Sequence, residues 1–269
     1  MDAIGLEHVS VFASGLDHPE CIAVSAEGVV FAGGEAGQVY RIARDGSWEV
    51  VANTGGFNLG LCLNRDGELL IADVGNTTIW SWTSDNGLVE RHRASAEQPL
   101  VHPNAFADSR HGTYFSDSGK WKSANGSIWL MGLDYECHQV STRASRFPNG
   151  MAMSPSGEYL YVVESNFGVV RLEVKQDGEL GPPEPVIALP GQVPDGIAFS
   201  AQGQLYVSFY QPNLVGRLTD EGALETVLYD PEAQVLSMPT NIAFLPDGRL
   251  IIANLGGWHI AASEVSALR

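Results

Sequence analysis

The sequence predicts an all-β fold, a six-bladed β-propeller with four antiparallel strands in each blade. Three observations lead to this prediction. One segment pattern recurs six times along the 269 residues, a glycine holds a fixed place in every copy, and a short run rich in β-branched and aromatic residues follows each glycine. Because no linker or low-complexity segment separates the copies, we expect residues 1–269 to form a single six-bladed domain.

Each copy contains one residue that lies eight positions before its glycine, which we call the ring residue. Successive ring residues are separated by 39 to 46 positions, and they are Glu20, Leu59, Asn104, Asn149, Asp195 and Thr240. The matching glycines are Gly28, Gly67, Gly112, Gly157, Gly203 and Gly248. A single offset kept through six copies indicates a structural repeat.

The run after each glycine is predicted to form the second strand of a blade. These runs are residues 29–32, 69–72, 113–116, 159–163, 205–208 and 250–253. A third strand follows in several copies, as in residues 37–42, and a fourth precedes the next ring residue, as in residues 225–228. With an inner strand that starts at the ring residue, each repeat has the four strands of a propeller blade.

The two ends of the chain are predicted to meet in one blade. The sixth copy stops soon after its third strand, near Trp258. A strand-like run, residues 8–12, leads directly into the first ring residue. We therefore expect this N-terminal strand to complete the last blade, which contains Ile251 and Ile252. Closure of this kind leaves no open sheet edge between the ends of the chain.

Composition limits the classes of partner. The chain has 15 Lys and Arg against 32 Asp and Glu, a formal net charge of −17. This disfavours nucleic acid and anionic membranes as partners, and it favours the attraction of cations. The expected partner is a small-molecule substrate. The N-terminus lacks the pattern of a signal peptide, and the three cysteines form no CxxC motif. The expected location is cytoplasmic, with reduced thiols.

The ring residues are candidates for a metal site, because in a propeller they converge on the central channel. Glu20 and Asp195 offer carboxylates, and Asn104 and Asn149 offer amide oxygens. Oxygen donors with two carboxylates suit Ca²⁺ best, with Mg²⁺, Mn²⁺ or Zn²⁺ as alternatives. A second interpretation stays open, in which these polar residues only hydrogen-bond to water that fills the channel.

Further polar residues end the second strands and are expected near the same face. They are Asp73, Asp117, Glu164 and Asn254, and the alternative is that they are ordinary turn residues. The loop that follows Asp117 brings Trp121 close to this face. The sequence contains no G-x-S-x-G elbow, P-loop, GxGxxG or HExxH motif, so those chemistries are not expected.

Three motifs give the chain a family resemblance: Pro19-Glu20, Phe147-Pro148-Asn149-Gly150 and Pro194-Asp195-Gly196. They resemble the metal motifs of the gluconolactonase, senescence marker protein (regucalcin) and luciferin-regenerating enzyme family. The resemblance extends over the whole repeat pattern. It implies a six-bladed propeller with Glu20, Asn149 and Asp195 as metal ligands. It also implies that Asp195 acts as the catalytic base or water activator. We expect Asn104 to be a fourth ligand or to lie one water molecule away from the ion.

The third copy departs from the family pattern. Sugar lactonases of this kind typically carry an Arg-x-Asn-Asp-Gly stretch, whereas this chain has His102-Pro103-Asn104-Ala105-Phe106. We therefore expect a substrate less polar than an aldonolactone. The residues predicted to bind it are Leu59, His102, Asp117 and Trp121, with Phe57, Phe167 and Trp258 as further aromatic candidates.

The predicted function is a Ca²⁺-dependent hydrolase that opens a small, hydrophobic lactone. Two alternatives remain from the sequence. The ring pattern is also similar to that of diisopropyl fluorophosphatase, so phosphotriester hydrolysis is a rival activity. A propeller that serves as a non-enzymatic binding platform, with a purely structural metal, is the second.

Overall fold

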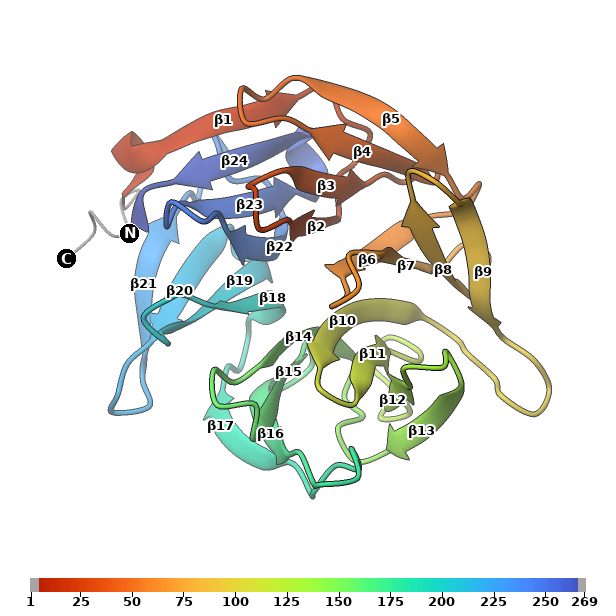
Figure 1. Cartoon of the computed structure of the whole chain (residues 1–269). Helices are drawn as coiled ribbons and strands as arrows, with labels where there is room; N and C mark the ends of the chain where they lie inside the picture. The colour runs from red at the N-terminus through yellow and green to blue at the C-terminus, as the bar shows by residue number, and fades with distance from the viewer. Residues whose placement is uncertain (1–4, 266–269) are drawn as a thin grey trace.

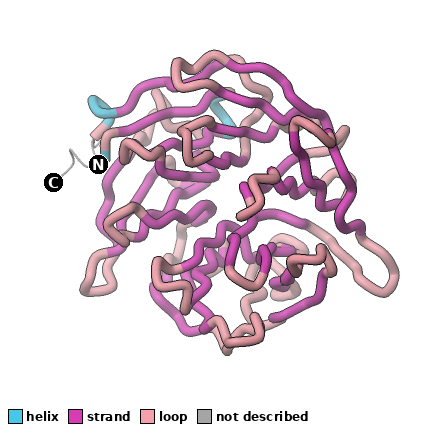
Figure 2. Tube along the Cα trace, in the orientation of Figure 1, coloured by secondary structure: helices cyan, strands magenta, loops and turns pink. Residues whose placement is uncertain are grey.

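The computed structural model describes residues 5–265, which form six four-stranded antiparallel sheets arranged around a central axis (Figure 1). The trace consists almost entirely of strands and loops (Figure 2). The helical elements of the described residues are two single 3₁₀ turns, η1 (Leu6–His8) and η2 (Leu255–Gly257). The predicted fold class is thus confirmed. No described helix is long and apolar enough to cross a bilayer.

Five blades are built from strands that follow one another along the chain, beginning next to the axis. Blade 1 contains β2 (Cys21–Val24), β3 (Val30–Gly33), β4 (Gln38–Ile42) and β5 (Trp48–Asn53). Blade 2 contains β6 (Asn58–Leu63), β7 (Leu69–Asp73), β8 (Thr78–Thr83) and β9 (Gly87–Arg93). Blade 3 contains β10 (Pro103–Ser109), β11 (Gly112–Asp117), β12 (Ser127–Met131) and β13 (Cys137–Ser141). Blade 4 contains β14 (Pro148–Met153), β15 (Tyr159–Glu164), β16 (Gly168–Glu173) and β17 (Glu184–Ala188). Blade 5 contains β18 (Val193–Phe199), β19 (Leu205–Gln211), β20 (Leu214–Leu218) and β21 (Leu224–Tyr229).

Blade 6 joins the two ends of the described chain. Its first three strands, counted outward from the axis, are β22 (Pro239–Phe244), β23 (Leu250–Asn254) and β24 (His259–Ser263), and its outer strand is β1 (Val9–Ser14). The pairing of β1 with β24 is antiparallel and runs from Val9 opposite Ser263 to Ser14 opposite His259. The expected closure by the N-terminal strand is therefore confirmed, and β22 contacts β2 to complete the circle.

The repeated glycines lie in the hairpins between the first and second strands of each blade, five in the turn and Gly112 as the first residue of β11. All six have a positive φ, between 72° and 125°: Gly28, Gly67, Gly112, Gly157, Gly203 and Gly248. Residues with a Cβ rarely adopt this conformation, which explains why glycine recurs at one offset. The offset then fixes where each inner strand begins, and so it places the ring residue at the same end of every blade.

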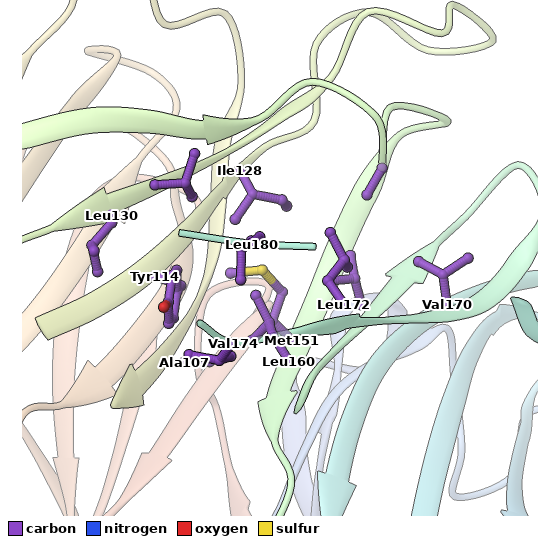
Figure 3. Close-up of a cluster of buried hydrophobic side chains, with 13 residues drawn as sticks. Ala107, Tyr114, Ile128, Leu130, Met151, Leu160, Val170, Leu172, Val174 and Leu180 are labelled. Carbon is purple, nitrogen blue, oxygen red and sulfur yellow. The ribbon is translucent and has the colours of Figure 1, made fainter. Parts of the chain in front are cut away.

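The apolar core consists of six clusters, each shared by two neighbouring blades. In the cluster between blades 3 and 4, Tyr114 and Ile128 face Met151 and Leu160 (Figure 3). Tyr114 also donates a hydrogen bond from its hydroxyl to the carbonyl of Gly178 at 2.7 Å. Because every core belongs to two blades, each blade is held by its neighbours, and the inner strands form a rigid frame around the axis.

Candidate metal centre and substrate cavity

A cavity of about 420 Å³ opens at the end of the axis where the inner strands begin. We call it the central cavity. Five of the six ring residues line it: Glu20, Leu59, Asn104, Asn149 and Asp195. The sixth, Thr240, is buried and donates its hydroxyl hydrogen to the carbonyl of Glu20 at 2.7 Å. The repeat therefore brings the predicted ring residues together on one face.

The ring is tight because the inner strands approach one another closely. A Cβ at Gly150 would lie 2.5 Å from the carbonyl oxygen of Asp195, and a Cβ at Gly196 would lie 2.4 Å from that of Thr240. Neither distance is compatible with a side chain. The glycine after a ring residue therefore allows the next blade to bring its own ring residue close to the axis.

The carboxylates of Glu20 and Asp195 face the central cavity without a cationic partner. None of the described residues that line the cavity is Lys or Arg. The Oε2 atom of Glu20 is buried and has no hydrogen-bond partner among the described residues. Burial, and then the nearby Asp195, raise the pKa of Glu20 well above its usual range. Burial likewise raises the pKa of Asp195 to about 7, although a hydrogen bond from Asn149 opposes this rise.

The two amide side chains are held in one orientation by serines. The Asn104 Nδ2 donates to the Ser118 hydroxyl at 3.0 Å, and the Asn149 Nδ2 donates to the Ser165 hydroxyl at 3.3 Å. Ser165 in turn donates to the carbonyl of Pro194 at 2.8 Å. Since the amide nitrogens are used in this way, the amide oxygens are the groups left for a ligand.

These residues fit a divalent cation. They offer oxygen donors only, two of them carboxylates, and a buried carboxylate oxygen without a partner is unfavourable unless a cation compensates it. The donor set matches Ca²⁺ better than Zn²⁺, which prefers nitrogen and sulfur ligands. Glu20, Asn104, Asn149 and Asp195 all line the cavity and are the residues that could hold such an ion.

The pair predicts a pH-dependent stability of the metal-free protein. In the folded protein the pKa values of Glu20 and Asp195 both lie above those of the same groups in the unfolded chain. Their contribution to the free energy of unfolding is therefore fully present below about pH 4, and it is lost as the pH rises through the folded-state pKa, about 7 for Asp195. After removal of divalent ions, the thermal midpoint of the wild type should fall between pH 5 and pH 8 by roughly 5–10 °C more than that of Asp195→Asn. Calcium should abolish the difference at pH 8. Equal pH profiles for the two proteins would show that Asp195 is not a buried, uncompensated acid.

An aromatic wall covers one side of the central cavity. The ring of Phe147 lies 4.9 Å from that of Trp121 and 5.3 Å from that of His102, measured between centroids. Phe147 has a φ of 62°, an uncommon conformation for a residue with a side chain. Burial lowers the pKa of His102, so its imidazole is neutral at neutral pH. Leu59, His102 and Trp121, all predicted to bind substrate, line this cavity.

Of Leu59, His102, Asp117 and Trp121, Asp117 alone does not line the central cavity, so the structure does not place it where it was expected. Its carboxylate accepts hydrogen bonds from the backbone N–H groups of Val101, His102 and Gly119, at 3.0, 2.7 and 3.2 Å. A carboxylate used by three backbone donors is not free to bind substrate. Asp117 instead fixes the backbone that carries His102.

The same arrangement recurs at the end of the second strand in four blades. In each of these blades the last residue of the second strand pairs across the sheet with the residue that precedes the ring residue. Its side chain also accepts a hydrogen bond from a backbone N–H of the loop that leads into the first strand. The acceptors are Asp73, Asp117, Glu164 and Asn254, and the donors are Phe57, His102, Arg146 and Ser237. These polar residues stabilise the loops around the cavity, which agrees with the interpretation of them as turn residues.

Some residues of the central cavity were not predicted from the sequence. They are Phe147, Ser165, Val193, Tyr210 and Gln211. Phe147 stands next to the Pro148-Asn149-Gly150 motif, and that position was the available signal. Three aromatic candidates lie elsewhere: Phe57 does not line the cavity, Phe167 packs in a core under Arg146, and Trp258 donates from its Nε1 to His18 at 2.9 Å.

Comparison with known proteins supports the fold and gives the family. A gluconolactonase from Xanthomonas campestris superposes with a TM-score of 0.79 at 20% identity, covering 94% of this chain and 88% of that one. A luciferin-regenerating enzyme gives a TM-score of 0.76 at 14% identity over 94% of each chain. A virginiamycin B lyase from Staphylococcus aureus gives 0.66 at 19% identity, covering 91% of this chain and 79% of that one. No curated protein matches the sequence.

At these identities the superpositions establish the six-bladed architecture. The family model described as "SMP-30/Gluconolactonase/LRE-like region" matches residues 92–253, which is more than half of the chain and spans blades 3 to 5 with parts of blades 2 and 6. The resemblance inferred from the three sequence motifs is thereby confirmed. The chain belongs to the SMP-30/gluconolactonase/LRE-like family.

Proposed function

We propose that this protein is a metal-dependent hydrolase that opens a small, apolar lactone. One observation carries the proposal: Glu20 and Asp195 lie uncompensated beside two oriented amides, in a cavity with an aromatic wall. A buried acidic pair of this kind has little structural value by itself, because each carboxylate raises the cost of ionising the other. It is what a site that binds a cation and moves a proton requires.

Glu20, Asn149 and Asp195, with Asn104, would hold the cation, Ca²⁺ by the chemistry of the donors. When bound, the ion supplies Lewis acidity toward an ester carbonyl and keeps the carboxylates ionised at neutral pH. Asp195 in its ionised form accepts a proton from the attacking water. Trp121 and Phe147 shield the reacting ester from bulk water, and His102 offers a neutral imidazole at the wall.

The walls favour an apolar substrate. Leu59 stands on the ring itself, and Trp121 and Phe147 supply large apolar surfaces. Sugar hydroxyls buried without hydrogen-bond partners would cost about 1–3 kcal/mol each. We therefore expect kcat/KM for an aryl lactone such as dihydrocoumarin to exceed that for gluconolactone by at least about tenfold at saturating calcium. A preference for the sugar lactone would contradict the apolar-cavity argument and leave the metal-dependent reaction intact.

The proposal is tested by a panel assayed with calcium and again after chelation. The panel contains an aryl lactone, an alkyl lactone, gluconolactone and a phosphotriester. Calcium-dependent opening of a lactone is the expected result. Turnover of the phosphotriester alone would favour the rival activity. If calcium binds but no member of the panel reacts, a binding platform with a structural metal becomes the better description.

A further inference from the structure

A second concave surface adjoins the central cavity at blade 5. Its volume is about 770 Å³, and it lies between the loops that connect β17 to β18, β19 to β20 and β21 to β22. We call it the side groove. Tyr210 and Gln211 line both spaces, and Val193 lines the cavity where its neighbour Gln192 lines the groove. The two spaces are therefore adjacent, with Tyr210 and Gln211 between them.

The side groove is uncharged on a strongly acidic chain. None of its described lining residues is Asp, Glu, Lys or Arg, although the chain carries a net charge of −17. Its walls include Pro190, Tyr210, Pro212, Tyr229 and Met238. Proline, tyrosine and methionine offer apolar surface, and the tyrosine hydroxyls, Gln192, Gln211, Asn213 and Ser237 offer uncharged polar atoms. Such a surface suits an uncharged, mainly apolar group.

The loop between β21 and β22 forms one wall of the groove, and hydrogen bonds to side chains hold it in place. Asp230 is fully buried and its Oδ2 accepts the N–H groups of Val235 and Leu236 at 2.7 and 2.9 Å. The side chain of Asn213 accepts the N–H of Met238 at 2.9 Å and donates to the carbonyl of Asp230 at 3.2 Å. A wall fixed in this way loses little conformational freedom when a ligand binds.

The groove exists where blade 5 departs from the repeated pattern. In blades 2, 3, 4 and 6 an acid or amide ends the second strand and ties down the loop that enters the inner strand. In blade 5 the residue before the ring residue is Pro194, and it pairs with Phe209, so Phe209 stands where the other blades have the acid or amide. Strand β19 then continues past Phe209 to Gln211. Tyr210 and Gln211 thus extend past the position of the acid and stand between the cavity and the groove.

We propose that the side groove binds an apolar, uncharged substituent of the substrate while the lactone ring of the same molecule occupies the central cavity. The inference rests on the proposed function and narrows its substrate class to lactones that carry an alkyl or acyl chain. The cavity of about 420 Å³ accommodates the reacting ring, and the adjacent groove of about 770 Å³ accommodates a chain that extends past Tyr210 and Gln211.

The first experiment compares δ-valerolactone with the same ring carrying a pentyl chain, δ-decalactone. The wild type should show a kcat/KM at least about tenfold higher for the pentyl lactone, because each buried methylene favours binding. Ala233→Trp adds a bulky side chain to the groove, and Gln192→Glu places a charge in it. Each variant should lose most of the kcat/KM preference for the pentyl lactone. Both should leave δ-valerolactone turnover unchanged. Gln202→Glu, an exposed glutamine in the turn between β18 and β19, is the matched control and should behave as wild type.

A binding measurement separates this inference from the proposed reaction. The matching lactams, 2-piperidone and 6-pentyl-2-piperidone, are titrated into the calcium-loaded protein, since lactams resist ring opening. Tighter binding of the pentyl lactam, lost in Ala233→Trp, would support the groove even if no lactone is hydrolysed. Lactone turnover without any chain-length preference, or a preference that both groove variants retain, would overturn the groove assignment and leave the hydrolase proposal standing.

Discussion

Replacing Asp195 by asparagine is expected to lower kcat/KM for any lactone substrate by a factor of at least about 10³. The substitution keeps the size of a side chain that is buried at the axis, and it removes the only ring carboxylate other than Glu20. Under the proposed function it therefore removes both the proton acceptor and one of the two carboxylates that would face the cation. The measurement is steady-state hydrolysis at saturating calcium, with the thermal midpoint recorded for each protein.

Glu20→Gln separates the proposed metal binding from the proposed proton transfer. We expect calcium affinity, measured by calorimetry, to weaken at least about a hundredfold, since one charged oxygen donor is lost. Excess calcium should restore part of the activity of Glu20→Gln and none of that of Asp195→Asn. Glu27→Gln and Asp220→Asn make the same chemical changes on exposed turns and should match the wild type. Unchanged calcium affinity in Glu20→Gln would remove Glu20 from the metal site.

Deletion of residues 1–13 is expected to abolish cooperative folding. The deletion removes nearly all of β1, the outer strand of blade 6, and with it the pairing to β24. It also removes Val9, Phe12 and Ala13 from the cores that blade 6 shares with its two neighbours. The loss should exceed the roughly 5–15 kcal/mol by which a domain is usually stable. Circular dichroism and a chemical denaturation curve would measure it.

Val11→Asp is a control for the deletion, because it changes β1 without removing it. Val11 lies on the outer strand and is 53% exposed, so its substitution keeps the β1–β24 pairing. The variant should retain a cooperative transition near the wild-type midpoint. If the truncated protein also unfolds cooperatively at that midpoint, the closing strand is dispensable and the ring is held by the inner strands alone.

Much of the architecture could be predicted because it is encoded locally. A glycine with positive φ is required at one place in every blade, and its offset marks the start of each inner strand. The ring residues Glu20, Asn104, Asn149 and Asp195 then converge by repetition, without any knowledge of long-range contacts. The missing strand at the C-terminal end and the spare strand at the N-terminal end were likewise visible in the sequence.

The residues around the ring could not be predicted in the same way. Asp117 was expected to contact substrate, but its carboxylate is used by backbone donors whose direction depends on the loop geometry. Phe147 lines the cavity through an unusual φ that a sequence pattern does not reveal. Tyr210 and Gln211 reach the cavity because β19 is longer than its repeat would indicate. In each case a local departure from the repeat decided the outcome.

The pairing of β1 with β24 also has a consequence for biosynthesis. Among the described strands β1 is synthesised first and β24 last. Blades 1 to 5 contain strands that are contiguous in the chain, so each can assemble as it is synthesised. Until β24 arrives, β1 has an unpaired edge, and the nascent protein is an open arc in which blades 6 and 1 do not yet meet. The need for a chaperone should therefore last until β24 has been synthesised.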